Sequence, residues 1–316
     1  MQSQKFLISM LEVQDLQKVM RENFNKPLNL TVKEEEEFQW STHCWICHRK
    51  YGRDEVPVRD HCHITGKYRG SAHDRCTLKL KISAEKIKIP VIFHNLKGYD
   101  SHLIMQEIGQ IIKDENEKIS EENTKITERK NKDENYDEKF IPYLGIKVIP
   151  CNYEKYMAFY LSKHLVFLDS FQFMSCSLDK LSSNLPSDKF FYTEKEFGEG
   201  ADLLKKKGDY PYDYMDSFDK FKRNKLPCKE DFYSSLTDKD ISDDDYNPAR
   251  NVGNTFEIRN IGEYHDLYLK SDILLLSDVF ENFRGTCLAN DGLDPAHYLT
   301  PPGLAWDAML KRQKSI

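Results

Sequence analysis

Cysteine and histidine are concentrated in one short part of this chain, and they constrain its folding more than any other feature. Residues 43–76 contain four of the eight cysteines and five of the ten histidines. Within them, Cys44 and Cys47 form a Cys-x2-Cys pair, and His73 and Cys76 form a His-x2-Cys pair 26 residues after Cys47. Two close pairs of sulfur and nitrogen ligands at this separation are typical of a tetrahedral structural zinc site. We therefore predict that these four residues bind Zn²⁺ and staple a segment too small to fold on its own core.

The remaining sequence indicates where such a site would be found. No apolar run approaches the ~20 residues that span a bilayer, and the start, "MQSQKFLISMLEVQ", lacks a secretory cleavage site. We expect no membrane partner and an intracellular, reducing location, such as a nucleus or a viral replication site, where clustered cysteines bind metal. The other four cysteines are expected to be buried thiols: Cys151, Cys176, Cys228 and Cys287.

Charge is unevenly distributed along the chain. The net charge is −6, but between His48 and Lys88 there are 11 Lys and Arg against five Asp and Glu. This local charge of +6 leaves −12 for the remainder. A basic module on an acidic chain fits phosphate binding, although a solvated lysine-rich face explains the charge equally well.

The sequence divides into a helical lead-in, a zinc module and an α/β region, which we place at residues 1–40, 41–82 and 83–316. Apolar residues at helical spacing predict a helix over 5–24, and Thr31 with Glu34 forms a capping box before a second helix.

Strand and helix signals alternate in the α/β region. "KIPVIFHNL" (88–96) predicts a buried strand, and "YDSHLIMQEIGQII" (99–112) an amphipathic helix. Residues 113–140 are almost entirely polar or charged, so we expect a disordered or loosely helical insertion there. "YMAFYLSKHLVFLDS" (156–170) predicts a hairpin, and residues 260–292 form the strongest helix pattern, with a cap at each end.

The stretch "VRDHCHITGKYRG" (58–70) lies between the two halves of the predicted zinc site. It resembles the endonuclease VII-like branch of the HNH nucleases, in which a treble-clef or ββα-metal fold carries a structural zinc beside a catalytic metal. That resemblance implies that Asp60 binds the catalytic metal and that His61 is the general base. It also makes His63 an auxiliary group and Arg69 a phosphate contact.

Two residues complicate this nuclease interpretation. The family's asparagine ligand follows the last zinc cysteine, and here Thr77, a poorer oxygen ligand, occupies that position. Cys62, between the two histidines, is a rival zinc ligand. The sequence therefore leaves two interpretations of this segment open: an active endonuclease VII-like DNase, and a non-catalytic zinc-dependent module that binds nucleic acid.

Four motifs in the α/β region resemble those of protein-primed family B DNA polymerases of the Polinton/Maverick, viral and linear-plasmid type. "VIFHNLKGYDSHLI" and "LYLKSDILLL" resemble the second and third exonuclease motifs. "FLDSFQFM" resembles the single-strand-binding motif, and "KKGDY" one whose lysine stabilises the primer end. Relatives of this kind carry an endonuclease VII-like zinc module before the second exonuclease motif, so both halves of the chain resemble one family.

The resemblance implies an RNase H-like 3′–5′ exonuclease fold and assigns roles within it. Asp100 and Asp272 would bind two Mg²⁺ or Mn²⁺ ions, and Tyr268 would orient the attacking water. The residues expected to contact single-stranded primer DNA are His94, Asn95, Tyr99, Ser170, Phe171 and Lys207. The parent enzyme's partners would be DNA and a terminal protein primer; the sequence leaves the oligomeric state open.

The first exonuclease motif, an Asp-x-Glu on a strand before the zinc module, is missing from this sequence, and so is the polymerase palm motif. The exonuclease domain is therefore expected to be incomplete, and we interpret the chain as a fragment of a DNA polymerase involved in DNA replication. As an isolated chain it is expected to bind zinc and DNA with little or no exonuclease or polymerase activity.

Overall fold

The computed structural model describes residues 26–80, 88–133, 136–152, 155–162 and 164–313. The helix predicted over 5–24 lies outside these residues. The chain divides into two compact units, one formed by residues 1–91 and 97–167 and the other by 92–96 and 168–316.

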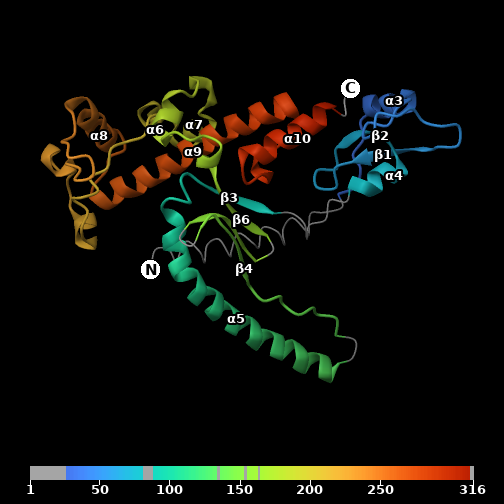
Figure 1. Cartoon of the computed structure of the whole chain (residues 1–316), viewed down its shortest axis with the longest axis horizontal. Helices are drawn as coiled ribbons and strands as arrows, with labels where there is room; N and C mark the ends of the chain where they lie inside the picture. The colour runs from blue at the N-terminus through green and yellow to red at the C-terminus, as the bar shows by residue number, and fades with distance from the viewer. Residues whose placement is uncertain (1–25, 81–87, 134–135, 153–154, 163, 314–316) are drawn as a thin grey trace. The chain divides into compact units, whose positions relative to one another are not determined.

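The zinc module in the first unit is a β-hairpin followed by a short helix (Figure 1). Strands β1 (Pro57–His61) and β2 (Tyr68–His73) pair antiparallel, with a bulge between Asp60 and His61. Helix α4 (Asp74–Thr77) and a 3₁₀ turn (Leu78–Leu80) follow. The module therefore has the β–β–α order expected from the sequence.

Helix α3 (Val32–Trp40) precedes the hairpin and begins at the capping box expected from the sequence. The Thr31 hydroxyl accepts a hydrogen bond from the Glu34 N–H at 3.3 Å, and the Glu34 carboxylate accepts one from the Thr31 N–H at 2.8 Å. This reciprocal pair satisfies two backbone donors at the helix start.

A four-stranded mixed sheet has the order β3-β6-β5-β4. Its strands are β3 (Ile89–Phe93), β4 (Ile146–Pro150), β5 (Tyr156–Leu161) and β6 (Leu165–Asp169). The expected hairpin is confirmed, because β5 pairs antiparallel with β6. On the buried face, the rings of Phe159 and Phe167 stack with centroids 4.3 Å apart. The chain is thus mixed α/β.

Helix α5 (Asp100–Lys132) continues through most of residues 113–140, for which a disordered or loosely helical insertion was expected, so the helical alternative is the one found. Contacts with a distant extended segment explain this order. The Asn116 side chain exchanges two hydrogen bonds with the Leu144 backbone, at 2.7 and 2.9 Å. Asn123, two turns further along the same face, does the same with the Ile141 backbone at 2.8 and 2.9 Å. These two amides fasten the returning chain to the helix.

Helix α9 (Ile261–Asp291) is the longest element of the second unit and is uninterrupted (Figure 1). It begins where expected, with the Asn260 side chain accepting from the Glu263 N–H at 2.9 Å. It ends at Gly292, whose φ of +62° is the left-handed conformation that glycine adopts most easily.

Short helices and 3₁₀ turns make up the rest of the second unit. The α-helices are α6 (Leu178–Ser183), α7 (Phe191–Phe197), α8 (Asp243–Thr255) and α10 (Pro301–Gln313). The 3₁₀ turns are Ser170–Gln172, Ser187–Lys189, Gly198–Leu204, Phe218–Lys222, Lys229–Phe232 and Pro295–His297.

The expectation that the four scattered cysteines are buried is wrong, because Cys151 and Cys228 are exposed and Cys176 and Cys287 are only partly buried. Among the described helices, none is long and apolar enough to cross a membrane.

Candidate functional site

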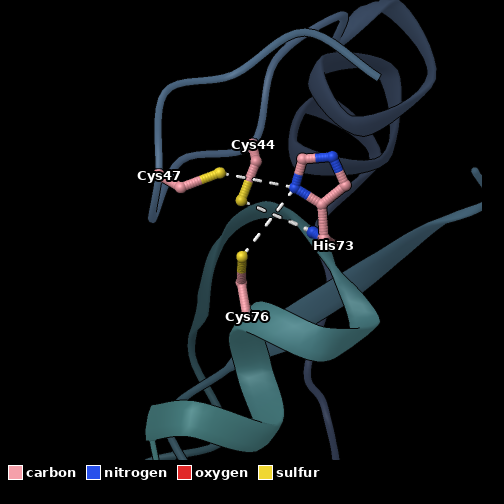
Figure 2. A group of neighbouring side chains, drawn as sticks. All are labelled: Cys44, Cys47, His73 and Cys76. Carbon is pink, nitrogen blue, oxygen red and sulfur yellow. Dashed lines mark hydrogen bonds between the residues drawn. The ribbon is translucent and has the colours of Figure 1, made fainter. Parts of the chain in front are cut away.

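The four predicted zinc ligands lie together in the first unit (Figure 2). Their ligand atoms all lie within 4.8 Å of one another. His73 Nδ1 is 3.4 Å from the Cys47 sulfur and 3.8 Å from the Cys76 sulfur. A tetrahedral zinc with Zn–S bonds of about 2.3 Å and a Zn–N bond of about 2.0 Å has edges of about 3.5 to 3.8 Å. The donor set and its spacing therefore fit a zinc ion.

Backbone hydrogen bonds hold the first ligand pair in a tight loop. The Cys44 N–H donates to the Arg49 carbonyl at 3.0 Å, and the His48 N–H donates to the Cys44 carbonyl at 2.8 Å. His48 has a φ of +57°, a conformation that reverses the chain just after Cys47. The second pair comes from the end of β2 and from α4, so that local turns place all four ligands.

A carboxylate that the sequence analysis did not identify orients the histidine ligand. His73 Nε2 lies 3.0 Å from Glu55 Oε2, while its Nδ1 faces the sulfurs. The Gly52 N–H at 2.8 Å and the Arg75 guanidinium at 2.7 Å also bind Glu55. The Gly52 N–H, and after it His73 and Arg75, lower the pKa of Glu55 and keep the carboxylate charged. A charged acceptor on Nε2 fixes the tautomer that leaves Nδ1 free for a metal.

The buried thiols of this group differ in acidity. Burial opposes ionisation of Cys44, but the N–H groups of Cys47, His73 and Ile46 surround its sulfur and lower its pKa to about 6. Burial, and then the neighbouring sulfurs, raise the pKa of Cys76 to about 11. Because a cation ionises every bound thiol, we expect zinc binding to release protons.

Replacing Glu55 with alanine is expected to weaken zinc binding roughly 10- to 100-fold, the usual cost of losing a carboxylate behind a histidine ligand. Competition with a chromophoric chelator measures the change. Asp54→Ala is the matched control, because it removes an exposed acid next to Glu55 that has no contact with His73. Equal affinities in the two variants would contradict the role assigned to Glu55.

Asp60, the predicted catalytic-metal ligand, is buried and already paired. Its carboxylate accepts from the Trp45 indole N–H at 3.1 Å and lies 2.9 Å from the Arg69 guanidinium. Arg69, the predicted phosphate contact, is thus used inside the module. The Thr77 hydroxyl donates to the Asp74 carbonyl at 2.7 Å. Asp60, Arg69 and Thr77 therefore each have a partner within the protein.

The two histidines of the nuclease-like motif lie side by side, with the ring centroids of His61 and His63 4.6 Å apart. Within the described residues, the zinc ligands form the group of three or more Cys, His, Asp or Glu side chains able to hold a metal. Cys62 is not part of that group. A catalytic metal at Asp60 therefore stays a prediction, and so does general-base catalysis by His61.

In the second unit, the His94 side chain hydrogen-bonds to the segment that follows β6 and so connects two predicted DNA-binding segments. His94 Nδ1 lies 2.9 Å from the Ser170 hydroxyl, and Nε2 lies 2.7 Å from the Cys176 carbonyl. Its ring meets that of Phe171 edge-on at 5.3 Å. The Asn95 N–H donates to Asp169 at 2.8 Å, and Asn95 has a φ of +72°. The structure therefore brings together four of the predicted DNA-binding residues: His94, Asn95, Ser170 and Phe171.

Lys207, Tyr268 and Asp272 form a second cluster in this unit. The Lys207 ammonium donates to the Tyr268 hydroxyl at 2.7 Å and forms an ion pair with Asp272 Oδ2. The Tyr212 and Tyr268 hydroxyls are 2.7 Å apart. The other Asp272 oxygen, Oδ1, is buried without a hydrogen-bond partner among the described residues.

Aromatic rings surround this cluster. The Tyr210 ring stacks on Tyr268 with centroids 4.9 Å apart and meets Tyr212 edge-on at 5.0 Å. Tyr212 is 67% exposed, whereas Tyr268 is buried. Burial, and then the charge of Asp272 and the Tyr212 hydroxyl, raise the pKa of Tyr268, so its phenol is neutral. The cluster presents an exposed ring, an ammonium group and a half-satisfied carboxylate together.

Asp100 and Tyr99 belong to the first unit, where Asp100 is the first residue of α5 and Tyr99 is exposed. Asp272 belongs to the second unit. The predicted meeting of Asp100 and Asp272 around two metal ions therefore stays a prediction.

Comparison with known proteins adds no assignment: no family model, no curated protein and no solved structure matches this chain. The chemistry of both sites therefore rests on their own residues.

Proposed function

We propose that the chain is part of a protein-primed family B DNA polymerase and that its second unit binds the single-stranded 3′ end of a primer. In this proposal the unit belongs to an RNase H-like 3′–5′ exonuclease region, and the zinc module is a stabilising insertion. The observation that supports it is the contact of Lys207 with Tyr268 and Asp272. These residues come from two separate motifs, more than 60 positions apart in the sequence. Lys207 was expected to contact the primer end, and Tyr268 and Asp272 were expected at the exonuclease centre.

The chemistry of the cluster suits a strand end. An exposed tyrosine ring such as that of Tyr212 offers a stacking surface that accepts any base. The Lys207 ammonium beside it can contact a terminal phosphate as a point charge. Together they account for recognition of single-stranded DNA without sequence preference.

The same contacts bear on catalysis. A divalent metal at Asp272 would lie beside the Lys207 ammonium, which already neutralises one carboxylate oxygen. Two positive charges at that distance repel one another strongly when partly buried. The cluster is therefore proposed to bind the primer end. Hydrolysis is expected to be absent or very slow.

Replacing Tyr212 with alanine is expected to weaken binding of a fluorescent oligothymidine by roughly 5- to 150-fold, equivalent to losing one stacked base worth about 1–3 kcal/mol. Lys207→Ala is expected to weaken it by roughly tenfold, because a charge-assisted contact is lost. Fluorescence anisotropy of the zinc-loaded full chain at fixed salt measures both.

Lys222→Ala is the matched control, because Lys222 is an exposed lysine of the same unit, paired only with exposed Asp219 at 3.1 Å. Its affinity should stay within twofold of the unmodified chain. Should Lys207→Ala and Tyr212→Ala bind as well as Lys222→Ala, the primer-end proposal fails. Rapid release of mononucleotides from a 3′-labelled strand with Mg²⁺ would instead disprove the absence of hydrolysis.

A further inference from the structure

A cavity of about 380 Å³ lies between α8 and the first turn of α9 in the second unit. It is separate in composition from the Lys207 cluster, since none of Lys207, Tyr212, Tyr268 and Asp272 lines it. Its volume is within the roughly 300–1,000 Å³ of small-molecule sites. Apart from those at the start of α9, the residues that line the cavity belong to none of the motifs identified in the sequence.

The charge lining this cavity is entirely positive. Lys225 and Arg250 contribute the charged groups, and no Asp or Glu lines it, although the chain has 52 acidic residues against 46 basic ones. Neither cation forms an ion pair with a described residue. Neighbouring lysines of the same region are paired, Lys222 with Asp219 and Lys229 with Asp243. Two unpaired cations from separate segments that face one cavity favour an anionic ligand.

Aromatic and aliphatic side chains share the walls of the cavity with polar ones. The rings of Tyr246 and Tyr264 line it together with Leu226 and Ile258. Both tyrosines are fixed by their hydroxyls: Tyr246 donates to the Pro227 carbonyl at 3.0 Å and Tyr264 to the Asp209 carbonyl at 2.7 Å. Because its hydroxyl is used elsewhere, the partly exposed ring of Tyr246 can offer its hydrocarbon surface to a planar group, whereas Tyr264 is 4% exposed.

We propose that this cavity binds a nucleoside monophosphate, with the base against the ring of Tyr246 and the phosphate between Lys225 and Arg250. Both cations are exposed and so lie at the opening, while Tyr246 is only partly exposed, which places the charges outside the aromatic ring. The Asn254 side chain also lines it and can hydrogen-bond to a base edge. The choice of a nucleotide among aromatic phosphate esters rests on the proposed function, since primer ends are made of nucleotides.

The test uses calorimetric titration of the full zinc-loaded chain with deoxyadenosine 5′-monophosphate, deoxyadenosine and inorganic phosphate. The monophosphate is expected to bind at one site and at least tenfold more tightly than either part alone. Arg250→Ala and Lys225→Ala should each weaken it by about tenfold, as expected for loss of a charge-assisted contact. Lys222→Ala, the matched control, should bind within twofold of the unmodified chain.

A second variant tests the cavity without changing charge. Gly253 lines the cavity, and a Cβ added there meets no atom within 4 Å. Gly253→Leu therefore fills the space without a backbone clash, and leucine favours the helix more than glycine does. Loss of nucleotide binding with an unchanged melting temperature is expected.

Two results would overturn the proposal: inorganic phosphate binding as tightly as the monophosphate, or unchanged nucleotide affinity in Gly253→Leu and in Arg250→Ala. Failure of this proposal can be told apart from failure of the primer-end proposal. Arg250→Ala should leave oligothymidine binding unchanged, and Tyr212→Ala should leave monophosphate binding unchanged.

Discussion

Replacing Cys76 with serine is expected to remove most of the bound zinc and to unfold the surrounding module, residues 41–80. The reason is the small size of its core. The buried residues of this core are Cys44, Ala72 and Cys76, with partly buried neighbours such as Val58 packed against them. Two of the three buried residues are metal ligands, so apolar burial alone supplies little of the stability.

We therefore expect zinc to supply most of the folding free energy of the module. Structural zinc sites in small peptides bind with about 10–16 kcal/mol at pH 7, which exceeds the stability of most small domains. Losing a ligand should weaken zinc binding by more than the roughly 10- to 100-fold expected for Glu55→Ala. Metal analysis measures zinc content, and amide hydrogen exchange measures protection in β1 and β2.

Cys62→Ser is the matched control, because Cys62 belongs to the same module but lies outside the group of ligands. It should keep its zinc and its protected amides. A strong chelator should reproduce the Cys76→Ser result in the unmodified chain. If Cys62→Ser loses zinc and Cys76→Ser does not, the assignment of the fourth ligand is wrong.

The zinc ligands could be predicted from the sequence because the chemistry of the site depends on short spacings. Two-residue gaps within each pair place both ligands on one turn, whatever the rest of the chain does. Glu55 could not be predicted in this way. Its contact with His73 arises from the packing of the loop before β1 against the end of β2, and one acid among 52 gives no signal of its own.

The length of α5 was left open for a related reason. Composition is compatible with either disorder or a loose helix at 113–140, since that segment has too few apolar residues to form a core. The deciding contacts join Asn116 to Leu144 and Asn123 to Ile141, across 28 and 18 positions. Likewise, Lys225 and Arg250 become one cavity mouth only after α8 has packed. Such long-range contacts leave no local pattern for sequence analysis to detect.

Replacing Asp278 with alanine is expected to destabilise the second unit by roughly 3–5 kcal/mol, because three donors, two of them buried, lose their acceptor. Asp278 lies on α9 and is 1% exposed. One carboxylate oxygen accepts from the Tyr192 N–H at 2.7 Å; the other accepts from the Thr193 N–H at 3.1 Å and the Thr193 hydroxyl at 2.7 Å.

These bonds replace a missing helix cap. Helix α7 begins after Phe190, whose side chain cannot accept a hydrogen bond, and no side-chain cap comes from its own segment. The N–H groups of Tyr192 and Thr193 are first-turn donors with no partner inside the helix. A carboxylate from α9 satisfies both and also interacts favourably with the positive end of the helix dipole. The Asp278 carboxylate therefore caps the start of α7 and holds that helix against α9.

Thermal unfolding followed by circular dichroism measures the effect, which should appear as a fall of roughly 6–20 °C in the transition of this unit. Glu281→Ala is the matched control, since Glu281 lies one turn further along α9 and forms a partly exposed ion pair with Arg284. That variant should change stability by no more than about 0.5 kcal/mol. The transition temperature of Asp278→Asn should lie between those of the two alanine variants. Its amide keeps one acceptor oxygen but places an NH2 donor opposite a protein donor. If Asp278→Ala and Glu281→Ala unfold at the same temperature, the Asp278 carboxylate does not hold α7 to α9.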